Sequence, residues 1–176
     1  MTSSLVGSEM CIRDSIYTVP VAGGRAMQIT TNPAYDTAPV WSPDSKRIAF
    51  ASDRMGSLDV YIVAKDGGEP RRLTTHSGSE TPLAFTDAGH VLFSAGIMPS
   101  AEAVVFPSNG QFNQVYRVSV EGGRPTMISS MPMECISINK EGAMLYQDKK
   151  GYEDYWRKHH VSPIARDIWM YTPGKE

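Results

Sequence analysis

The residues with the greatest capacity for chemistry gather near the C-terminal end of the sequence. Three aromatic residues are followed there by two cationic residues and an adjacent histidine pair: Tyr152, Tyr155, Trp156, Arg157, Lys158, His159 and His160. Cationic groups hold carboxylates through charge-assisted hydrogen bonds, and aromatic rings hold cations and apolar side chains. One prediction for this segment is therefore direct contact with peptides. The competing prediction is a loop that packs its aromatic rings against the rest of the fold.

No pattern in the sequence predicts catalysis or metal binding. The nucleophile motif G-x-S-x-G, a P-loop and an EF-hand loop are all absent from the sequence. His159 and His160 would point to opposite faces of a strand, which is poor geometry for a shared metal. We therefore predict no catalytic residue, no metal and no cofactor in this chain. Asp44, in the string SPDSK, is assigned to a turn.

Charge and hydropathy exclude two classes of partner. The 176 residues include 17 basic and 19 acidic ones, so the net charge is −2. Proteins that bind nucleic acid through bulk charge carry a basic surplus, and no apolar run here reaches the roughly 18 residues of a membrane helix. We expect neither nucleic-acid binding nor membrane insertion. Cytoplasmic, periplasmic and secreted locations stay open, with the cytoplasm slightly preferred.

The elements that position these residues come from an internal repeat. Each unit starts with a short β-rich stretch around an aromatic residue, continues with a glycine pair, and then has a Thr or Ser pair. The aromatic residues are Tyr17, Tyr61, Tyr116 and Trp169, spaced by 44, 55 and 53 residues. Such a stripe is typical of core packing between repeats. The glycine pairs suit hairpin turns that need positive φ.

The repeat predicts an all-β fold, an incomplete β-propeller. Four short strands in about 44 residues are typical of one propeller blade. We expect about three four-stranded blades and the first strand of a fourth, with units at about 16–58, 59–112, 113–166 and from 167. The longer units hold one insertion within 96–111 and another within 147–166. The first insertion contains Phe106 and Asn109, and Phe112 directly follows it. Insertions in repeat proteins often lie on one face, frequently the binding face.

Two stretches of the sequence resemble known families. The string from Ala38 to Arg54, which contains WSPDSKRIAFASDR, followed by DVYIV and a glycine pair, resembles the TolB-like propeller repeat. The stretch from Gly151 to Tyr171 looks like the propeller of tricorn-protease-like serine peptidases. That resemblance implies a large enzyme whose propellers precede a PDZ module and a serine peptidase core. No position of this chain matches the motif of that core, so no catalytic residue is carried over.

The resemblance sets the functional expectations. We expect a non-catalytic propeller segment involved in proteolysis, supporting or gating peptide access to a catalytic core absent from this chain. Its partners would be peptides or other domains of the same polypeptide, and the full-length protein could form homo-oligomers. The alternatives are a TolB-like periplasmic interaction propeller without enzymatic activity and the propeller of a prolyl-oligopeptidase-like enzyme. Residues 1–15 carry no repeat strand, and we expect them to be a non-native leader.

Overall fold

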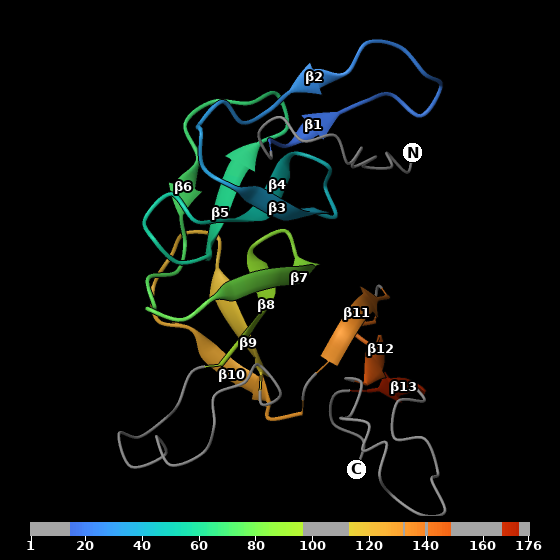
Figure 1. Cartoon of the computed structure of the whole chain (residues 1–176). Coiled ribbons are helices and arrows are strands. Elements are labelled where there is room, and N and C mark those ends of the chain that lie inside the picture. The colour runs from blue at the N-terminus through green and yellow to red at the C-terminus, as the bar shows by residue number, and fades with distance from the viewer. Residues whose placement is uncertain (1–14, 97–112, 132, 140, 149–166, 173–176) are drawn as a thin grey trace, which may run out of the picture.

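Thirteen strands make up the described part of the computed structural model, which covers residues 15–96, 113–131, 133–139, 141–148 and 167–172. They form a two-stranded sheet, two four-stranded sheets and a three-stranded sheet, all antiparallel and each built from consecutive strands (Figure 1). The bounds are β1 Tyr17–Thr18, β2 Met27–Gln28, β3 Asp36–Trp41, β4 Arg47–Ser52, β5 Asp59–Ala64, β6 Arg71–Arg72, β7 Glu80–Asp87, β8 His90–Ala95, β9 Gln114–Ser119, β10 Thr126–Ser129, β11 Met133–Ile138, β12 Met144–Asp148 and β13 Ile168–Tyr171. This arrangement confirms the predicted all-β, incomplete propeller. The described part contains no helix long and apolar enough to cross a membrane.

The sheets are out of phase with the repeat units of the sequence. The first four-stranded sheet takes β3 and β4 from the first unit and β5 and β6 from the second. The strand 168–171, expected to open a fourth unit, pairs with β12 and is the third strand of the three-stranded sheet. Each unit thus completes one sheet and begins the next. The predicted unit boundaries describe the sequence repeat, and the sheets are shifted from them by two strands.

The hydrophobic core lies between successive sheets. Ile48 and Phe50 on one face of β4 pack with Ile16 and Ile29 of the segment around β1 and β2. Ala49, on the other face of β4, belongs to a cluster shared with the second four-stranded sheet. A third cluster joins that sheet to the three-stranded sheet through Leu92, Val115, Met133, Met144 and Tyr146. Every core therefore depends on two neighbouring sheets.

The repeated aromatic residues behave differently in complete and incomplete sheets. Tyr61 and Tyr116 are buried, and their rings stack on Phe50 and Phe93 with centroids 5.9 and 5.6 Å apart. The prediction of core packing is confirmed for these two. It is wrong for Tyr17 and Trp169, which are 44% and 52% exposed. Among the described residues, the ring is buried only where the sheet has all four strands.

The turn motifs of the repeat fold as their residue types predict. Both glycines of each pair have positive φ, for example 89° at Gly67 and 117° at Gly68, a region that costs other residues free energy. Ser42 and Asp44 form a compact turn in which the Ser42 hydroxyl donates to Asp44 Oδ1 at 2.6 Å. The Lys46 amide donates to the same oxygen. The assignment of Asp44 to a turn is confirmed.

The Thr pairs of the repeat cap strands. The Val60 amide donates to Thr74 Oγ1 at 2.9 Å, and the Ile16 amide donates to Thr30 Oγ1 at 3.0 Å in the equivalent position of the preceding unit. Both threonines are buried. A buried amide without a partner costs free energy, so a hydroxyl at this position satisfies a group that the outer strand does not reach.

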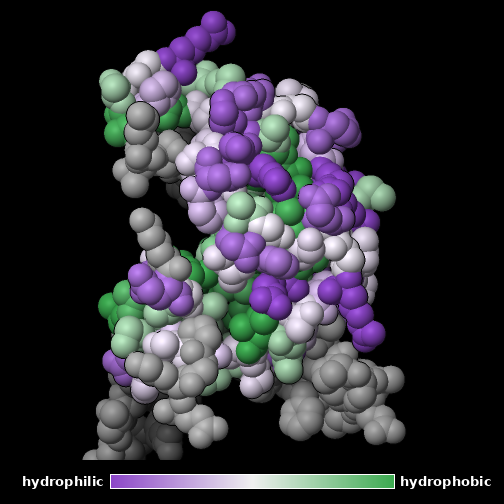
Figure 2. All heavy atoms as spheres, turned by 180° about the vertical axis from the view of Figure 1, so that it is seen from behind, coloured by the Kyte–Doolittle hydropathy of each residue, from purple (hydrophilic) through white to green (hydrophobic). Residues whose placement is uncertain are grey.

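One apolar face stays open in the described structure. Leu145, Ile168 and Met170 lie on the three-stranded sheet at positions whose counterparts in the first sheet, Ala49, Val60 and Ile62, are buried against the next sheet. Ile168 is 79% exposed and Met170 is 71% exposed. Figure 2 shows hydrophobic residues at the surface in the region of this sheet, beside a face that is otherwise largely polar. Exposed apolar faces of this kind favour association.

We predict that Phe93→Ala lowers the free energy of unfolding by about 3 to 5 kcal/mol, because a fully buried aromatic ring is lost from the core between the two four-stranded sheets. Denaturant unfolding followed by circular dichroism measures the change. Tyr35→Ala is the matched control, since Tyr35 is 44% exposed and should change stability by less than about 1 kcal/mol. Equal effects of the two substitutions would contradict this placement of the core.

Candidate functional site

The candidate peptide-contact residues at 152–160 lie outside the described residues, as do Phe106, Asn109 and Phe112. Their predicted role is therefore an expectation that rests on residue types. The strands that flank the two segments are described. Residues 96–113 connect β8 to β9, and residues 149–167 connect β12 to β13. Both segments thus join the second strand of a sheet to its third.

The two connections begin and end at the same end of their sheets. In the first four-stranded sheet the equivalent positions are Ser52, where β4 stops, and Asp59, where β5 starts, and these two residues are paired. We call this end of the sheets the insertion end. The first strand of each sheet also starts there, because Asp36 pairs with Ser52 and Glu80 pairs with Ala95.

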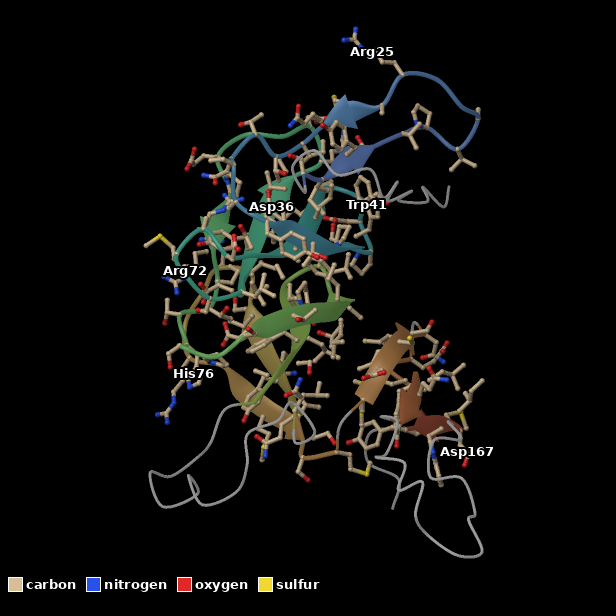
Figure 3. The ribbon with its side chains drawn as sticks, viewed as in Figure 1. Arg25, Asp36, Trp41, Arg72, His76 and Asp167 are labelled. Carbon is tan, nitrogen blue, oxygen red and sulfur yellow. The ribbon has the colours of Figure 1, made fainter. Side chains whose placement is uncertain are left out.

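Buried charges concentrate at the insertion end. Asp36, Asp59 and Glu80 are each 4% exposed or less. Arg54 Nη2 lies 2.9 Å from Asp36 Oδ1, and Arg72 Nη2 lies 2.8 Å from Asp59 Oδ2. Figure 3 labels Asp36 at one end of β3, with Trp41 at the other, and shows Arg72 on the same sheet. We refer to these three carboxylates and two guanidinium groups as the buried charge cluster.

Arg54 has the most complete set of partners in the cluster. Its Nε donates to the Ser52 hydroxyl at 2.9 Å, while Nη2 donates to Asp36. Its guanidinium lies over the rings of Phe50 and Tyr61, 5.4 and 4.6 Å from their centroids. A partly desolvated cation over aromatic faces is stabilised by the ring quadrupoles. Arg54 therefore ties the buried aspartate to the aromatic stack of the core.

Glu80 is the carboxylate of the cluster that no arginine of the described structure pairs with. Its backbone amide donates to the Leu58 carbonyl at 2.7 Å, which fixes the start of β7 against the β4–β5 connection. Neither of its carboxylate oxygens has a hydrogen-bond partner among the described residues. Burial raises the pKa of Glu80 to about 7. The Thr74 hydroxyl and the Arg72 guanidinium lower this pKa in part, and the Asp59 carboxylate raises it.

The buried charge cluster is better suited to holding a proton than to binding a metal ion. Among the described residues, no group of three or more His, Cys, Asp or Glu side chains could hold a metal ion. Two of the three carboxylates face guanidinium groups instead, and an arginine is a permanent cation. What remains is a carboxyl group that can take up or release a proton near neutral pH. Sequence inspection missed it, although acidic residues open both D-T-A-P and E-T-P, at Asp36 and Glu80.

A shallow groove lies between the four-stranded sheets at their opposite end. Its volume is about 420 Å³, and its lining includes Lys46, Arg47, Arg71, Glu69 and Glu121. Arg71 and Arg47 both face Glu121, at 3.4 and 4.0 Å, and the Glu121 side chain is 75% exposed. Arg71 also donates to the Val120 carbonyl. These exposed ion pairs bridge the two sheets, and such pairs add little stability.

The described histidines serve local structure. The Gly78 amide donates to His76 Nδ1 at 3.0 Å. His90 Nδ1 lies 3.0 Å from Asp87 in the turn between β7 and β8. Side-chain and backbone hydrogen bonds from His90 and Gly89 hold the pKa of Asp87 below its ordinary value, against the opposing effect of burial. His76 therefore orders the connection between β6 and β7, and His90, the first residue of β8, orders the turn that precedes it.

Comparison with known proteins identifies a family and several relatives. The family model for the tricorn protease N-terminal beta propeller domain matches residues 9–176. Tricorn protease homolog 1 of Streptomyces coelicolor is 23% identical over 158 residues, which is 89% of this chain and 14% of that protein. The Tol-Pal system protein TolB of Bordetella pertussis is 44% identical over 55 residues, which is 31% of this chain and 13% of that protein. This chain thus spans about one seventh of each of these relatives.

A solved structure supports the fold. The crystal structure of TolB from Acinetobacter baumannii superimposes with a TM-score of 0.62 at 16% identity, covering 90% of this chain and 35% of that one. At this identity the likeness concerns the fold. The family match also begins at residue 9, inside the segment 1–15 that we expected to be foreign, and the boundary at residue 15 stays a prediction.

We predict that Arg54→Met lowers the free energy of unfolding by about 3 to 5 kcal/mol, because it leaves Asp36 buried beside no cation. Lys65→Met is the matched control. It breaks an exposed pair with Asp66, worth less than about 1 kcal/mol. Urea unfolding at pH 7 compares the two variants with the parent chain. A loss below 1 kcal/mol for Arg54→Met would show that the buried pair contributes no more than a surface pair.

Proposed function

We propose, since this chain belongs to the family of tricorn protease N-terminal β-propeller domains, that it is a non-catalytic propeller segment of a tricorn-like serine peptidase. In this role it supports or gates the passage of peptides to a catalytic core elsewhere in a longer protein. The observation that carries the proposal is the extent of the match, which covers residues 9–176. The similarity to a tricorn protease homologue extends over 158 residues, which is 89% of this chain.

The second candidate is a TolB-like interaction propeller. Its support is the 44% identity to TolB, which extends over only 55 residues. That length equals about one repeat unit of this sequence, where aromatic spacings are 44 to 55 residues. A match as long as one unit indicates only that the repeat motif is present. The string from Ala38 to Arg54 resembles the TolB-like repeat, so a tricorn-like propeller can contain this motif as well. The longer match therefore favours the tricorn-like protein.

The gating role is supported by the topology at the insertion end. The connection between β12 and β13 starts there and holds the aromatic and cationic residues at 152–160. The other long connection, between β8 and β9, starts at the same end of its sheet. Two long segments on one end of a rigid scaffold are a common arrangement for binding residues. Arg157 and Lys158 would hold peptide carboxylates, and Tyr155 and Trp156 would hold apolar side chains.

The coding sequence around this chain gives the first test. We expect it to continue into a PDZ module and a peptidase region with a serine nucleophile and a histidine. A coding sequence that closes the propeller and then stops would overturn the peptidase proposal. A signal peptide, together with capture of cell-envelope proteins rather than oligopeptides, would support the TolB-like candidate.

Peptide binding gives the second test. We predict that the double variant Arg157→Ala/Lys158→Ala weakens the binding of fluorescently labelled acidic oligopeptides by tenfold or more, because it removes two cations from the connection. Fluorescence anisotropy at low salt measures the affinity, since exposed charge contacts weaken as ionic strength rises.

The control for this test is Arg25→Ala/Lys65→Ala, which removes the same charge from exposed positions elsewhere. Figure 3 shows Arg25 at the far end of the molecule, beside the two-stranded sheet. Equal weakening by the two double variants would show that net charge alone binds the peptide. The parent chain should bind peptides and leave them intact, and hydrolysis by it would contradict a non-catalytic segment.

A further inference from the structure

The buried charge cluster has more carboxylates than cations. Three carboxyl groups, Asp36, Asp59 and Glu80, face two guanidinium groups, Arg54 and Arg72. The two arginine–aspartate pairs are each neutral. An ionised Glu80 would therefore leave one uncompensated negative charge in a region shielded from water, which costs several kcal/mol. Protonation of Glu80 makes the whole cluster neutral.

The surroundings of Glu80 leave few ways to stabilise an anion. Asp59 of β5 is the acidic neighbour and Arg72 of β6 is the basic one, while Thr74, after β6, offers a hydroxyl. Arg72 already lies 2.8 Å from Asp59. On β8, the cross-strand neighbour of Glu80 is Ala95, which has no polar side chain. From β3, Asp36 is paired with Arg54. No second cation among these neighbours compensates the extra charge.

The place of Glu80 in the fold gives its proton a structural role. Glu80 is the first residue of β7, and β7 is the first strand of the second four-stranded sheet. Its acidic and basic neighbours belong to the first four-stranded sheet. Its backbone amide also bonds to the Leu58 carbonyl in the β4–β5 connection. The residue therefore lies at the junction where one sheet passes to the next.

We propose that Glu80 is a proton-dependent latch: the protonated carboxyl completes a neutral cluster and holds the start of β7 against the first four-stranded sheet, and the ionised carboxylate loosens this junction. The protonated form also has an O–H donor, and Asp59 Oδ1 is a carboxylate oxygen without a hydrogen-bond partner among the described residues. The latch acts at the insertion end, so its release would loosen the anchorage of the β6–β7 connection there.

The sign of the pH dependence follows from linkage. The pKa of Glu80 is about 7 in the folded chain, against an ordinary value of 4.5. Between these values the folded chain holds a proton that the unfolded chain has released, so stability falls as the pH rises and levels off above pH 7. If the carboxyl titrates with one of these pKa values in the folded chain and with the other in the unfolded chain, the unfolding equilibrium constant rises on the order of 40-fold between pH 5 and pH 7.

The test compares Glu80→Gln with the whole parent chain by urea unfolding at pH 5, 6, 7 and 8. Gln cannot ionise, so the variant should lack most of this 40-fold change. Glu69→Gln, at an exposed position beside the groove at the opposite end of the sheets, should keep it. The proposal is overturned if Glu80→Gln retains the pH dependence of the parent chain.

A second measurement needs no variant. Carbon-13 NMR of the chain labelled only at glutamate side-chain carboxyl carbons should show one glutamate that titrates near pH 7, well above the others. Hydrogen exchange of the Glu80 amide should accelerate selectively across the same titration. The reference at each pH, which removes intrinsic base catalysis, is the amide of buried Ile48 at the other end of β4. Glutamates that all titrate below pH 6, or an unchanged Glu80-to-Ile48 exchange ratio, would overturn the latch.

Discussion

The constraint on which this structure depends is that each sheet is apolar on both faces. β4 shows it most clearly, since the apolar residues Ile48, Ala49, Phe50 and Ala51 are all buried in succession. A strand of this kind cannot border water on either side, so a sheet is stable only between two others. The cores between successive sheets and the stacked tyrosines follow from this requirement, and the exposed Ile168 and Met170 mark a described face where it is not met.

The same constraint explains why charge collects where strands begin. Sheet faces that pack against a neighbouring sheet do not accept charged groups, and the three buried carboxylates lie at the first residues of β3, β5 and β7. At the insertion end, however, the first strand of one sheet passes beside its neighbour, and Asp36, Asp59 and Glu80 become buried there. Burial then makes the balance of charge important, because an unpaired ion inside costs far more than one at the surface. Glu80 is sensitive to pH for this reason.

Local features of the fold were predictable from the sequence, and the assembly of those features was not. Positive φ at Gly67 and Gly68 and the turn around Asp44 follow from residue chemistry within a few positions. Which four strands of the repeat form one sheet cannot be predicted in this way, because a repeat has no intrinsic first strand. Only the hydrogen bonding between β4 and β5 shows that these two strands, from different repeat units, belong to the same sheet. The buried charge cluster was missed for a related reason. Asp36 and Glu80 are 44 residues apart, and acidic residues beside prolines read as turn residues until burial is known.

The repeat itself leaves little chemistry free for function. The repeated aromatic residues stack or pair within sheets, the glycine pairs turn the chain, and the threonines of the first two units cap strands, so these residues are occupied by the fold. This is why one unit can match TolB at 44% identity while the longer similarity to a tricorn protease homologue is 23%. Residues shared through the repeat specify a propeller, and a propeller can serve many activities. On the function proposed above, what distinguishes one member from another resides in the connections at the insertion end.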